Sequence, residues 1–180
     1  MATSEALQGS VKPRGGRSGE PTLHVVLVAP EIHTNTGNIG RLCVAAGAAL
    51  HLVEPLGFEI TSSRLRRAGL DYWELLEWHR WPDWSSFVAA HAARGGRCWF
   101  TSGRGRLRHT EVPYARGDAL VFGRESSGLP QELLDREAER TVRIAIRPEA
   151  RSLNVAHAAG IVVFEALRRL EETGVTVGVV

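Results

Sequence analysis

Residues 23–54, LHVVLVAPEIHTNTGNIGRLCVAAGAALHLVE, contain the pattern that decides the fold class. Residues 23–29 form a short, β-branched apolar run that stops at a proline, which predicts a buried strand. Apolar residues then recur at helical spacing up to a glycine, and Asn35 or Thr36 is a suitable N-cap for that helix. A second apolar run, residues 50–54, predicts the next strand. A strand, a helix and a strand in this order predict two parallel neighbours in a sheet.

The rest of the chain continues this alternation. Ser152 is a suitable N-cap for the last helix, and Asp83 for a helix in the middle of the chain. The pattern predicts an α/β fold: a single domain over residues 21–175, with a mostly parallel sheet flanked by helices. Residues 1–20 are rich in Gly, Ser, Arg and Pro, so we expect a flexible tail there. The further expected strands are residues 75–81, 97–101, 119–123 and 141–146, and the further expected helices are residues 62–68, 83–93, 129–136 and 153–172.

Composition excludes several classes of protein. With 43% hydrophobic and 23% charged residues, the 180-residue chain is neither collagen-like nor of low complexity. It has no apolar run near about 18 residues and no apolar stretch typical of a secretory signal, so we expect no association with a membrane. Cys43 and Cys98 lie far apart and the seven histidines are scattered, which favours reduced thiols, a cytoplasmic location and no metal site.

The basic residues are unusual in kind, although the net charge is only +2. Lys12 is the only lysine among the 22 basic residues, and the others are arginines. A codon bias toward G and C explains this, and so does recognition of an anion, because the guanidinium group binds phosphate with two hydrogen bonds and stacks on bases. Local basic groups on a nearly neutral chain favour a nucleic acid over a membrane as the partner. The groups are Arg64, Arg66 and Arg67; Arg104, Arg106 and Arg108; and Arg140, Arg143, Arg147 and Arg151.

Three polar segments, each close behind an expected strand, are the candidates for chemistry. They are residues 35–41 (NTGNIGR), 123–130 (GRESSGLP) and 144–155 (IAIRPEARSLNV). Ligands of parallel sheets bind beyond the carboxyl ends of the strands. We therefore expect a site where the second and third of these segments meet residues 101–105.

Each segment holds one side chain that a simple structural role explains only in part. Arg41 is either a surface residue of a helix or a group aimed at a phosphate or a developing oxyanion. Glu125 belongs either to an ordinary turn or to a site, where it would accept a hydrogen bond from a sugar hydroxyl, a backbone N–H or an arginine. Asn154 is unfavourable inside a helix, so a polar contact to a ligand or a neighbouring loop would explain it. The motifs of P-loop NTPases, dinucleotide-binding enzymes and α/β-hydrolases are missing, as is an acidic cluster for a metal-dependent nuclease.

Together these segments resemble the SPOUT superfamily of RNA methyltransferases, most closely its TrmH-like branch of 2′-O-ribose methyltransferases. The resemblance covers residues 23–172. Residues 30–32 (PEI), 54–58 (EPLGF) and 64–72 (RLRRAGLDY) are similar to the small TrmL subgroup. That subgroup methylates the ribose of nucleotide 34, a cytidine or uridine, in tRNA.

The resemblance implies a fold, a cofactor and partners. The C-terminal part would form a deep trefoil knot, and S-adenosylmethionine, without a metal, would bind in it. The protein would work as a homodimer through its first and last helices, with Arg41 of one subunit near the methyl donor held by the other. The substrate would be the anticodon stem-loop of a tRNA.

The resemblance also implies the site residues, position by position. S-adenosylmethionine would contact Thr101, Ser102, Gly123, Glu125, Ile144, Ser152 and Leu153. The catalytic residues would be Arg41, Ser152 and Asn154. The RNA would contact Asn35, Arg41, Arg64, Arg67 and Arg104.

Two other functions fit the same residues. The chain could be a related SPOUT enzyme that acts on another ribose of tRNA or rRNA. It could also be an RNA-binding protein that keeps the fold without turnover. Binding of S-adenosylmethionine and methyl transfer to tRNA distinguish these alternatives.

Overall fold

The computed structural model describes residues 20–59 and 73–177. The expected tail and the expected helix at residues 62–68, with Arg64 and Arg67, lie outside these ranges. The elements, in chain order, are β1 (His24–Val28), α1 (His33–Ala46), β2 (Ala49–Val53), β3 (Trp78–Trp81), α3 (Trp84–Ala92), β4 (Cys98–Thr101), β5 (Leu107–Arg108), β6 (Ala119–Phe122), α4 (Gln131–Arg136), β7 (Thr141–Arg143) and α5 (Val155–Glu172). Short 3-10 turns occupy Trp73–Leu75 and Ala138–Arg140.

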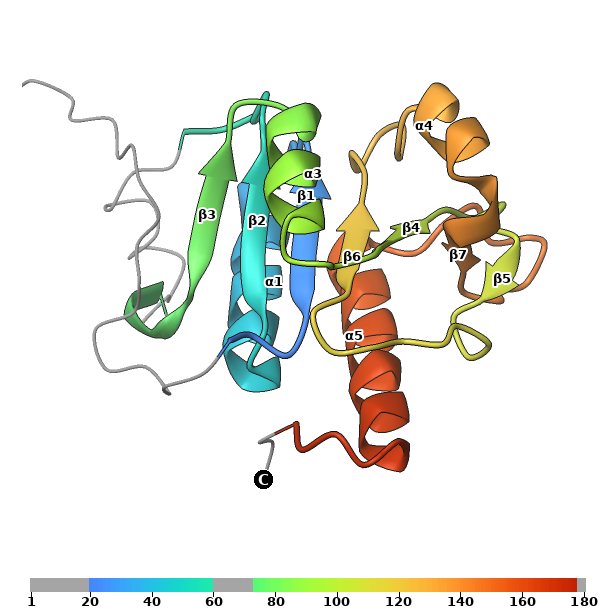
Figure 1. The fold of residues 1–180 in the computed structure, drawn as a ribbon. Coiled ribbons are helices and arrows are strands. Elements are labelled where there is room, and N and C mark those ends of the chain that lie inside the picture. The colour runs from blue at the N-terminus through green and yellow to red at the C-terminus, as the bar shows by residue number, and fades with distance from the viewer. Residues whose placement is uncertain (1–19, 60–72, 178–180) are drawn as a thin grey trace, which may run out of the picture.

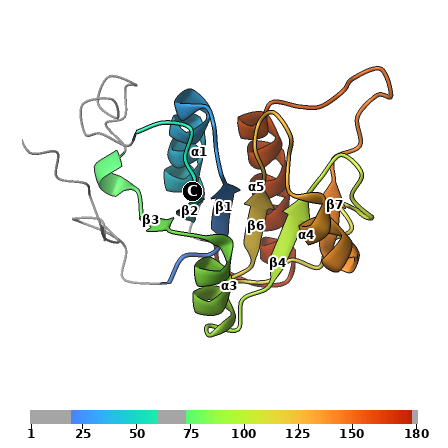
Figure 2. The ribbon, with the colours of Figure 1, turned by 90° about the horizontal axis from the view of Figure 1, so that it is seen from above.

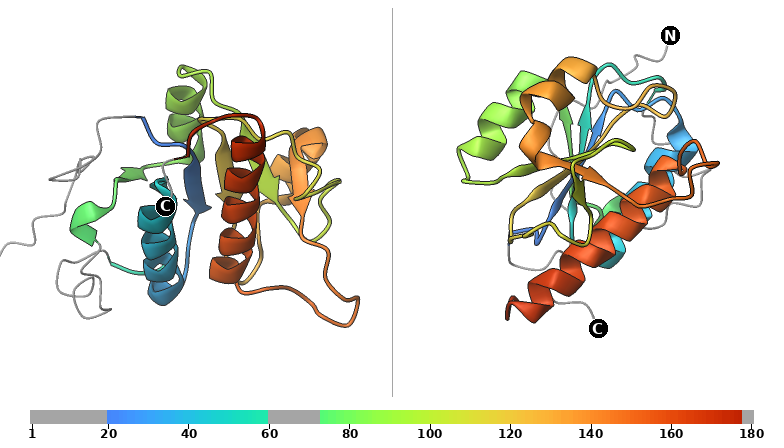
Figure 3. Two further views of the ribbon diagram at one scale, coloured as in Figure 1. Left: turned by 90° about the horizontal axis from the view of Figure 1, so that it is seen from below. Right: turned by 90° about the vertical axis from the view of Figure 1, so that its right-hand side faces the viewer.

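The strands of the described residues form one parallel sheet in the order β3-β2-β1-β6-β4-β7-β5. Helices α1 and α5 cover one face, whereas α3 and α4 lie on the other (Figures 1 and 2). On the first face α1 and α5 pack side by side (Figure 3). The prediction of an α/β fold with a mostly parallel sheet is confirmed, and the trefoil knot stays a prediction.

The sheet is buried on both faces, as parallel sheets usually are. Successive residues of β1 therefore pack into two different cores. Val25 and Leu27 belong to the core under α1 and α5, whereas Val26 packs with Phe87 of α3 in the second core. This explains why residues 23–29 are an unbroken apolar run rather than an alternating one.

The helix caps differ from the sequence-based expectation in two places. Helix α1 begins at His33 after Ile32, which provides no side-chain cap, so the prediction that Asn35 or Thr36 is the N-cap is wrong. Both residues lie inside the first turn and are buried. At the start of α5 the N-cap is Asn154, not Ser152. By contrast, Asp83 caps α3 as predicted and accepts a hydrogen bond from Ser86 N at 2.7 Å.

The region after β4 and β7 also differs from expectation. Strand β7 ends at Arg143, so the expected strand at residues 141–146 is too long by its last three residues. The two-residue strand β5 lies between the expected strands at residues 97–101 and 119–123, where no further strand was predicted, and it pairs with β7 at the edge of the sheet. The chain between β7 and α5 therefore leaves the sheet early, and residues 144–154 are available to form a site.

Asp118 lies just before β6, at the amino-terminal edge of the sheet, and its side chain connects β6 to neighbouring segments. Its carboxylate is 2% exposed and accepts hydrogen bonds from four donors. Arg97 donates from Nε at 3.0 Å and from Nη2 at 2.8 Å, while Trp99 Nε1 and Ala115 N each donate at 2.8 Å. A buried carboxylate needs such partners to offset the cost of its desolvation.

Histidines lie side by side on neighbouring strands beneath α3. His24 of β1, His51 of β2 and His79 of β3 point to this face, and Phe87 of α3 packs on His51. The rings of His51 and His79 stack with their centroids 4.9 Å apart. His24 and His51 are 6% and 3% exposed, and His24 Nδ1 lies 2.9 Å from His51 Nε2.

The hydrogen bonds of these histidines fix the positions of their protons. Trp81 Nε1 lies 3.0 Å from His51 Nδ1, and an indole N–H can only donate. His51 therefore carries its proton on Nε2 and donates it to His24 Nδ1, so both rings are neutral. Burial, and then the nearby His91, lowers the pKa of His24 to about 4. Burial, and then His24, holds the pKa of His51 well below its usual value of 6.5.

We expect the free energy of unfolding to fall steeply as the pH drops from 6.5 toward 4. In this range the unfolded chain binds protons that the native rings cannot accept, and at higher pH neither state is protonated. Each pH unit costs about 1.4 kcal/mol, so His24 alone removes about 2.5 kcal/mol by pH 4.5. Urea unfolding at pH 7, 5.5 and 4.5 measures this loss.

A double variant and a surface control assign the effect. His24→Leu/His51→Leu is expected to remove most of the acid sensitivity, whereas the exposed control His157→Gln leaves it unchanged. Equal free energies of unfolding of the natural chain at pH 7 and pH 4.5 would show that these histidines take up protons in the native state.

Candidate active site

Three loops leave neighbouring strands at the same edge of the sheet. Strands β6, β4 and β7 are adjacent and parallel, so the segments after them emerge side by side, as predicted. Thr101 at the end of β4 donates its hydroxyl hydrogen to Val121 O at 2.7 Å. Ser102 N donates to Val142 O at 2.8 Å. These bonds fix the end of β4 between its two neighbours.

The turn after β6 is closed on itself. Arg124 and Gly128 exchange backbone hydrogen bonds of 3.1 and 2.9 Å, and Gly128 has a positive φ of 73°. A Cβ atom at Gly123 would lie 2.1 Å from the carbonyl carbon of Gly128. The turn therefore requires glycine at position 123, and any side chain there would force the turn open.

Glu125 joins this turn to the start of α1. Its Oε2 accepts a hydrogen bond from Glu31 N at 2.8 Å, and its Oε1 accepts from Ile32 N at 3.2 Å and from Asn35 Nδ2 at 3.1 Å. Glu31 returns the contact, because its Oε2 accepts from Ser126 N at 3.0 Å. The hydrogen bonds from Ser126 lower the pKa of Glu31. The two carboxylates thus fasten the segments after β1 and β6 to each other.

Asn35 extends this connection to the start of α5. Its Nδ2 donates to Glu125, so its Oδ1 is left to accept, and Asn154 Nδ2 donates to it at 3.0 Å. Asn154 Oδ1 in turn accepts from Ala156 N at 2.9 Å and His157 N at 3.4 Å as the N-cap of α5. A single hydrogen-bonded chain, Glu125–Asn35–Asn154, therefore links the segments after β1, β6 and β7. Asn154 was expected inside the last helix, with a polar contact to a ligand or a neighbouring loop. It is instead the N-cap of α5, and its polar contact is to Asn35 in the first turn of α1.

The other candidate residues are not part of the hydrogen-bonded chain Glu125–Asn35–Asn154. Arg41 is exposed on α1, about two turns after its start. Ser152 and Leu153 are exposed just before α5, Ile144 is half-buried after β7, and Arg104 is exposed after β4. The structure places these residues at or next to the edge where the three loops emerge, apart from Arg41.

The edge has the character that a nucleoside-containing cofactor requires. Ile146 and Leu153, which are 37% and 38% exposed, present apolar surface in the segment after β7. Small-molecule sites commonly bind a ring on apolar side chains and orient it with a few polar groups. S-adenosylmethionine fits this set of residues. Within residues 20–59 and 73–177, no group of three or more His, Cys, Asp or Glu residues is arranged to hold a metal ion.

Glu31 is the site residue that sequence reasoning missed. The PEI segment at residues 30–32 was part of the resemblance, but no role was assigned to its carboxylate. The signal was present in the sequence, since Glu31 and Glu125 each lie three residues after a strand, and β1 and β6 are neighbours. Their pairing could be inferred only once the strand order was known.

Comparisons with known proteins show the family to which the chain belongs. The model of the SpoU rRNA Methylase family matches residues 22–164. A tRNA (cytidine(34)-2′-O)-methyltransferase of Burkholderia cenocepacia (strain HI2424) is 49% identical over 147 residues, which are 81% of this chain and 94% of that protein. A solved structure described as "Structural insights into the 2-OH methylation of C/U34 on tRNA" is 43% identical, with a TM-score of 0.78 over 83% of this chain and 97% of that one. The AdoMet-bound rRNA methyltransferase from Sinorhizobium meliloti is 32% identical, with a TM-score of 0.74 over 84% of this chain and 58% of that one.

The chain therefore belongs to the SpoU methylase family. Within that family, relatives at 42% to 49% identity carry the name tRNA (cytidine(34)-2′-O)-methyltransferase. No helix in the part of the chain that the structure describes is long and apolar enough to cross a membrane.

Proposed function

We propose that this protein transfers a methyl group from S-adenosylmethionine to the ribose 2′-hydroxyl of nucleotide 34, a cytidine or uridine, in tRNA. The observation that carries the proposal is the hydrogen-bonded chain Glu125–Asn35–Asn154, which joins the segments after β1, β6 and β7 at one edge of the sheet. The high identity to relatives with this name, over 81% of the chain, supports the same reaction and the same nucleotide. Acting on tRNA, the protein would work in the cytoplasm.

The donor would be held by the three loops after β4, β6 and β7. Thr101, Ser102, Gly123, Ile144, Ser152 and Leu153 would contact S-adenosylmethionine, in large part through backbone groups. When bound, S-adenosylmethionine supplies a methyl group on a positively charged sulfur for an in-line displacement. Both carboxylate oxygens of Glu125 accept hydrogen bonds from the segment at the start of α1. We therefore assign Glu125 a positioning role besides its expected contact with the cofactor.

The protein must orient the ribose hydroxyl, stabilise the charge that develops on its oxygen, and let the proton of the hydroxyl pass to solvent as the oxygen–methyl bond forms. Arg41 is our candidate for the second task. A guanidinium group stays protonated in proteins, so Arg41 is poorly suited to act as a base. We propose that it holds the phosphate next to the target ribose and stabilises the forming alkoxide. Ser152 and Asn154 would hold the reacting groups, and Arg64, Arg67 and Arg104 would contact the anticodon stem-loop. Asn35 is 7% exposed and hydrogen-bonded to Glu125 and Asn154, so its part in RNA binding would be to position Asn154.

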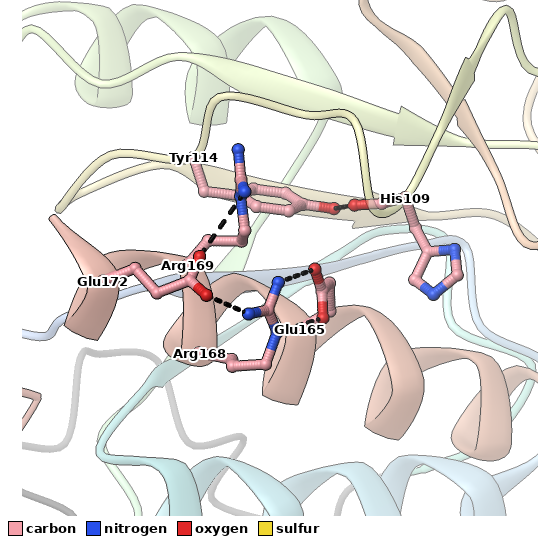
Figure 4. A network of polar contacts seen from close by, with 6 residues as sticks. All are labelled: His109, Tyr114, Glu165, Arg168, Arg169 and Glu172. Atoms are coloured by element: carbon pink, nitrogen blue, oxygen red, sulfur yellow. Dashed lines mark hydrogen bonds and ion pairs between the residues drawn. The ribbon is translucent and has the colours of Figure 1, made fainter.

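A homodimer would bring Arg41 of one subunit to the donor held by the other. The outer surface of α5 supports such an interface. Ile161 and Phe164 are 40% and 48% exposed and lie one turn apart on the same side of the helix. Farther along the same side, Arg168 pairs with Glu165 and Glu172 (Figure 4). An apolar patch next to a row of fixed charges is typical of the core and rim of an interface.

Replacing Arg41 distinguishes a charge-stabilising role from proton transfer. Arg41→Ala is expected to lower kcat about 100-fold, the usual cost of losing one group that stabilises developing charge. Arg41→Lys keeps a cation, so we expect partial activity with an unchanged pH–rate profile. A pH–rate profile of Arg41→Lys that is shifted, with most activity restored, would instead support proton transfer by this residue.

Two assays test the proposed function against its alternatives. Calorimetry with S-adenosylmethionine is expected to show binding by the purified protein, and labelled methyl groups are expected to pass to total tRNA but not to rRNA. Methylation of rRNA alone would favour a related enzyme with another target. Binding of tRNA without any methyl transfer would favour a non-catalytic RNA-binding protein.

A further inference from the structure

A hollow lies at the same edge of the sheet, beside the turn after β6. Its volume is about 510 Å³, which is within the range of small-molecule sites. Ala29 and Glu54, at the ends of β1 and β2, form one side. Arg124, Leu129 and Gln131, from the turn and the start of α4, form the other. None of the residues expected to bind S-adenosylmethionine lines this hollow.

The hollow lies where the topology of the sheet diverges. The chain passes from β1 through α1, which lies on one face of the sheet, to β2, which is the neighbour of β1 on the β3 side. Its neighbour β6 leads through α4, on the opposite face, to the β7 side of the sheet (Figure 2). Because the connections after β1 and β6 run to opposite faces of the sheet, they leave a crevice beyond the carboxyl ends of these two strands. In open α/β sheets this crevice is where ligands bind.

The backbone at Ala29 is strained. Its φ of +52° lies in the left-handed region, which residues with a Cβ rarely adopt. Its N–H is held by Val53 O at 2.8 Å, so this conformation is fixed by the pairing of β1 with β2. Such strain persists where the surrounding structure enforces it, and it concentrates at functional sites.

The charges around the hollow are balanced. Arg124 is the cation of its lining, and it lies close enough to Glu31 to help lower the pKa of that carboxyl. Glu54 is paired with Arg80, whose Nε donates to Glu54 Oε1 at 2.6 Å. Among the described residues, the two charged groups of the lining, Arg124 and Glu54, are therefore each close to an opposite charge, so the described lining favours a neutral ligand over a phosphate.

The remaining lining suits a flat ring with polar edges. Pro55 and Leu129 contribute apolar side chains to the lining, and Ser127 contributes a hydroxyl. Gln131 Nε2 donates to Asp135 Oδ1 at 2.8 Å, which leaves the amide oxygen of Gln131 to accept a hydrogen bond. The guanidinium plane of Arg124 is able to stack on such a ring. Unpaired RNA bases are recognised by this combination of stacking and contacts to their edges.

We propose that this hollow binds the unstacked base of a nucleotide that flanks the methylated one in the RNA substrate. This proposal rests on the proposed function. The turn of residues 123–128 serves both sites, because Glu125 points to Asn35 whereas Arg124 and Ser127 line the hollow. Seating the neighbouring base on one side of the turn would hold the target ribose on the other.

Filling the hollow tests the proposal. Ser127 is exposed, so Ser127→Trp is expected to fold normally and to occupy the space of the base. We expect its Kd and KM for full-length tRNA to rise about tenfold, which is the usual loss of affinity when the stacking of one base is removed. Gln131→Ala is expected to raise both severalfold, and Glu132→Ala, an exposed change on the next residue of α4, leaves them unchanged. Affinity for S-adenosylmethionine stays the same in all three.

A tRNA that lacks one base identifies the ligand. Two tRNAs are compared, one without the base of nucleotide 33 and one without the base of nucleotide 35. We expect the natural protein to bind one of them about tenfold more weakly than the complete tRNA. The same tRNA should lose nothing further with Ser127→Trp, because the variant already excludes that base. The proposal is overturned, even if nucleotide 34 is methylated, if Ser127→Trp and Gln131→Ala bind tRNA with the Kd of the natural protein. It is also overturned if the loss of affinity from the missing base and the loss from Ser127→Trp are additive. Weaker binding by both variants without methyl transfer by the natural protein supports the hollow and overturns the proposed reaction, and no tRNA binding at all overturns both.

Discussion

Glu125→Ala is expected to lower kcat for methyl transfer to tRNA by about 10²- to 10³-fold while the protein stays folded. The change removes the acceptor for two backbone N–H groups and for the amide of Asn35. Without it, Asn35 loses the contact that orients its oxygen toward Asn154, and the segment after β1 separates from the turn after β6. A displacement of reacting groups by about 1 Å costs about 10²-fold in rate, and the loss of groups that stabilise charge adds to this. Steady-state kinetics with saturating S-adenosylmethionine measures the effect.

Two variants show that the loss arises from this connection. Glu125→Gln keeps the length of the side chain and one acceptor oxygen, so we expect activity between that of the natural chain and Glu125→Ala. Glu132→Ala removes an exposed carboxylate nearby and is expected to be fully active. Activity of Glu125→Ala within threefold of the natural protein would contradict the positioning role of Glu125.

Asp118→Ala is expected to lower the free energy of unfolding by about 3 kcal/mol. Breaking a buried ion pair costs about 3–5 kcal/mol, and we take the lower value because the Arg97 side chain is 40% exposed and is able to turn toward water. Trp99 is buried, so its indole N–H cannot turn toward water and is left without a hydrogen-bond acceptor. Denaturant unfolding at pH 7 measures the change.

The same variant separates stability from activity. Asp118 precedes β6 at the amino-terminal edge of the sheet, opposite the candidate active site. We therefore expect the folded fraction of Asp118→Ala to keep its kcat. Glu171→Ala, on the exposed end of α5, is expected to change the free energy of unfolding by less than about 0.5 kcal/mol. A loss below about 1 kcal/mol in Asp118→Ala would show that its four hydrogen bonds contribute little.

Most of the fold could be predicted because it rests on local patterns. A parallel strand buried on both faces leaves an unbroken apolar run, so β1, β2, β4 and β6 were found to within two residues of their ends. The expected strand at residues 141–146 was too long because Ile144 and Ile146 continue the apolar pattern, although the chain has already left the sheet there. Sequence patterns record which side chains are apolar, but they do not record where a strand loses its neighbour.

The errors at the site share one physical cause, which is long-range contact. Asn154 was expected inside a helix because local rules favoured Ser152 as the cap. Its amide caps α5 and also reaches Asn35, which is 119 positions away in the sequence. Outside the site, the pairing of His24 with His51 could not be predicted for the same reason, since only the register of β1 and β2 makes these side chains neighbours. The loops that converge were identified correctly because they follow adjacent strands.

Mapping the methylated nucleoside by mass spectrometry is the most direct test of the proposed reaction. An unmodified tRNA transcript with cytidine or uridine at nucleotide 34 is incubated with the purified protein and S-adenosylmethionine, digested and sequenced by fragment mass. We expect one added methyl group, on the ribose of nucleotide 34. A methyl group on a base or on another ribose, or no methyl group although both tRNA and S-adenosylmethionine bind, would contradict the proposal.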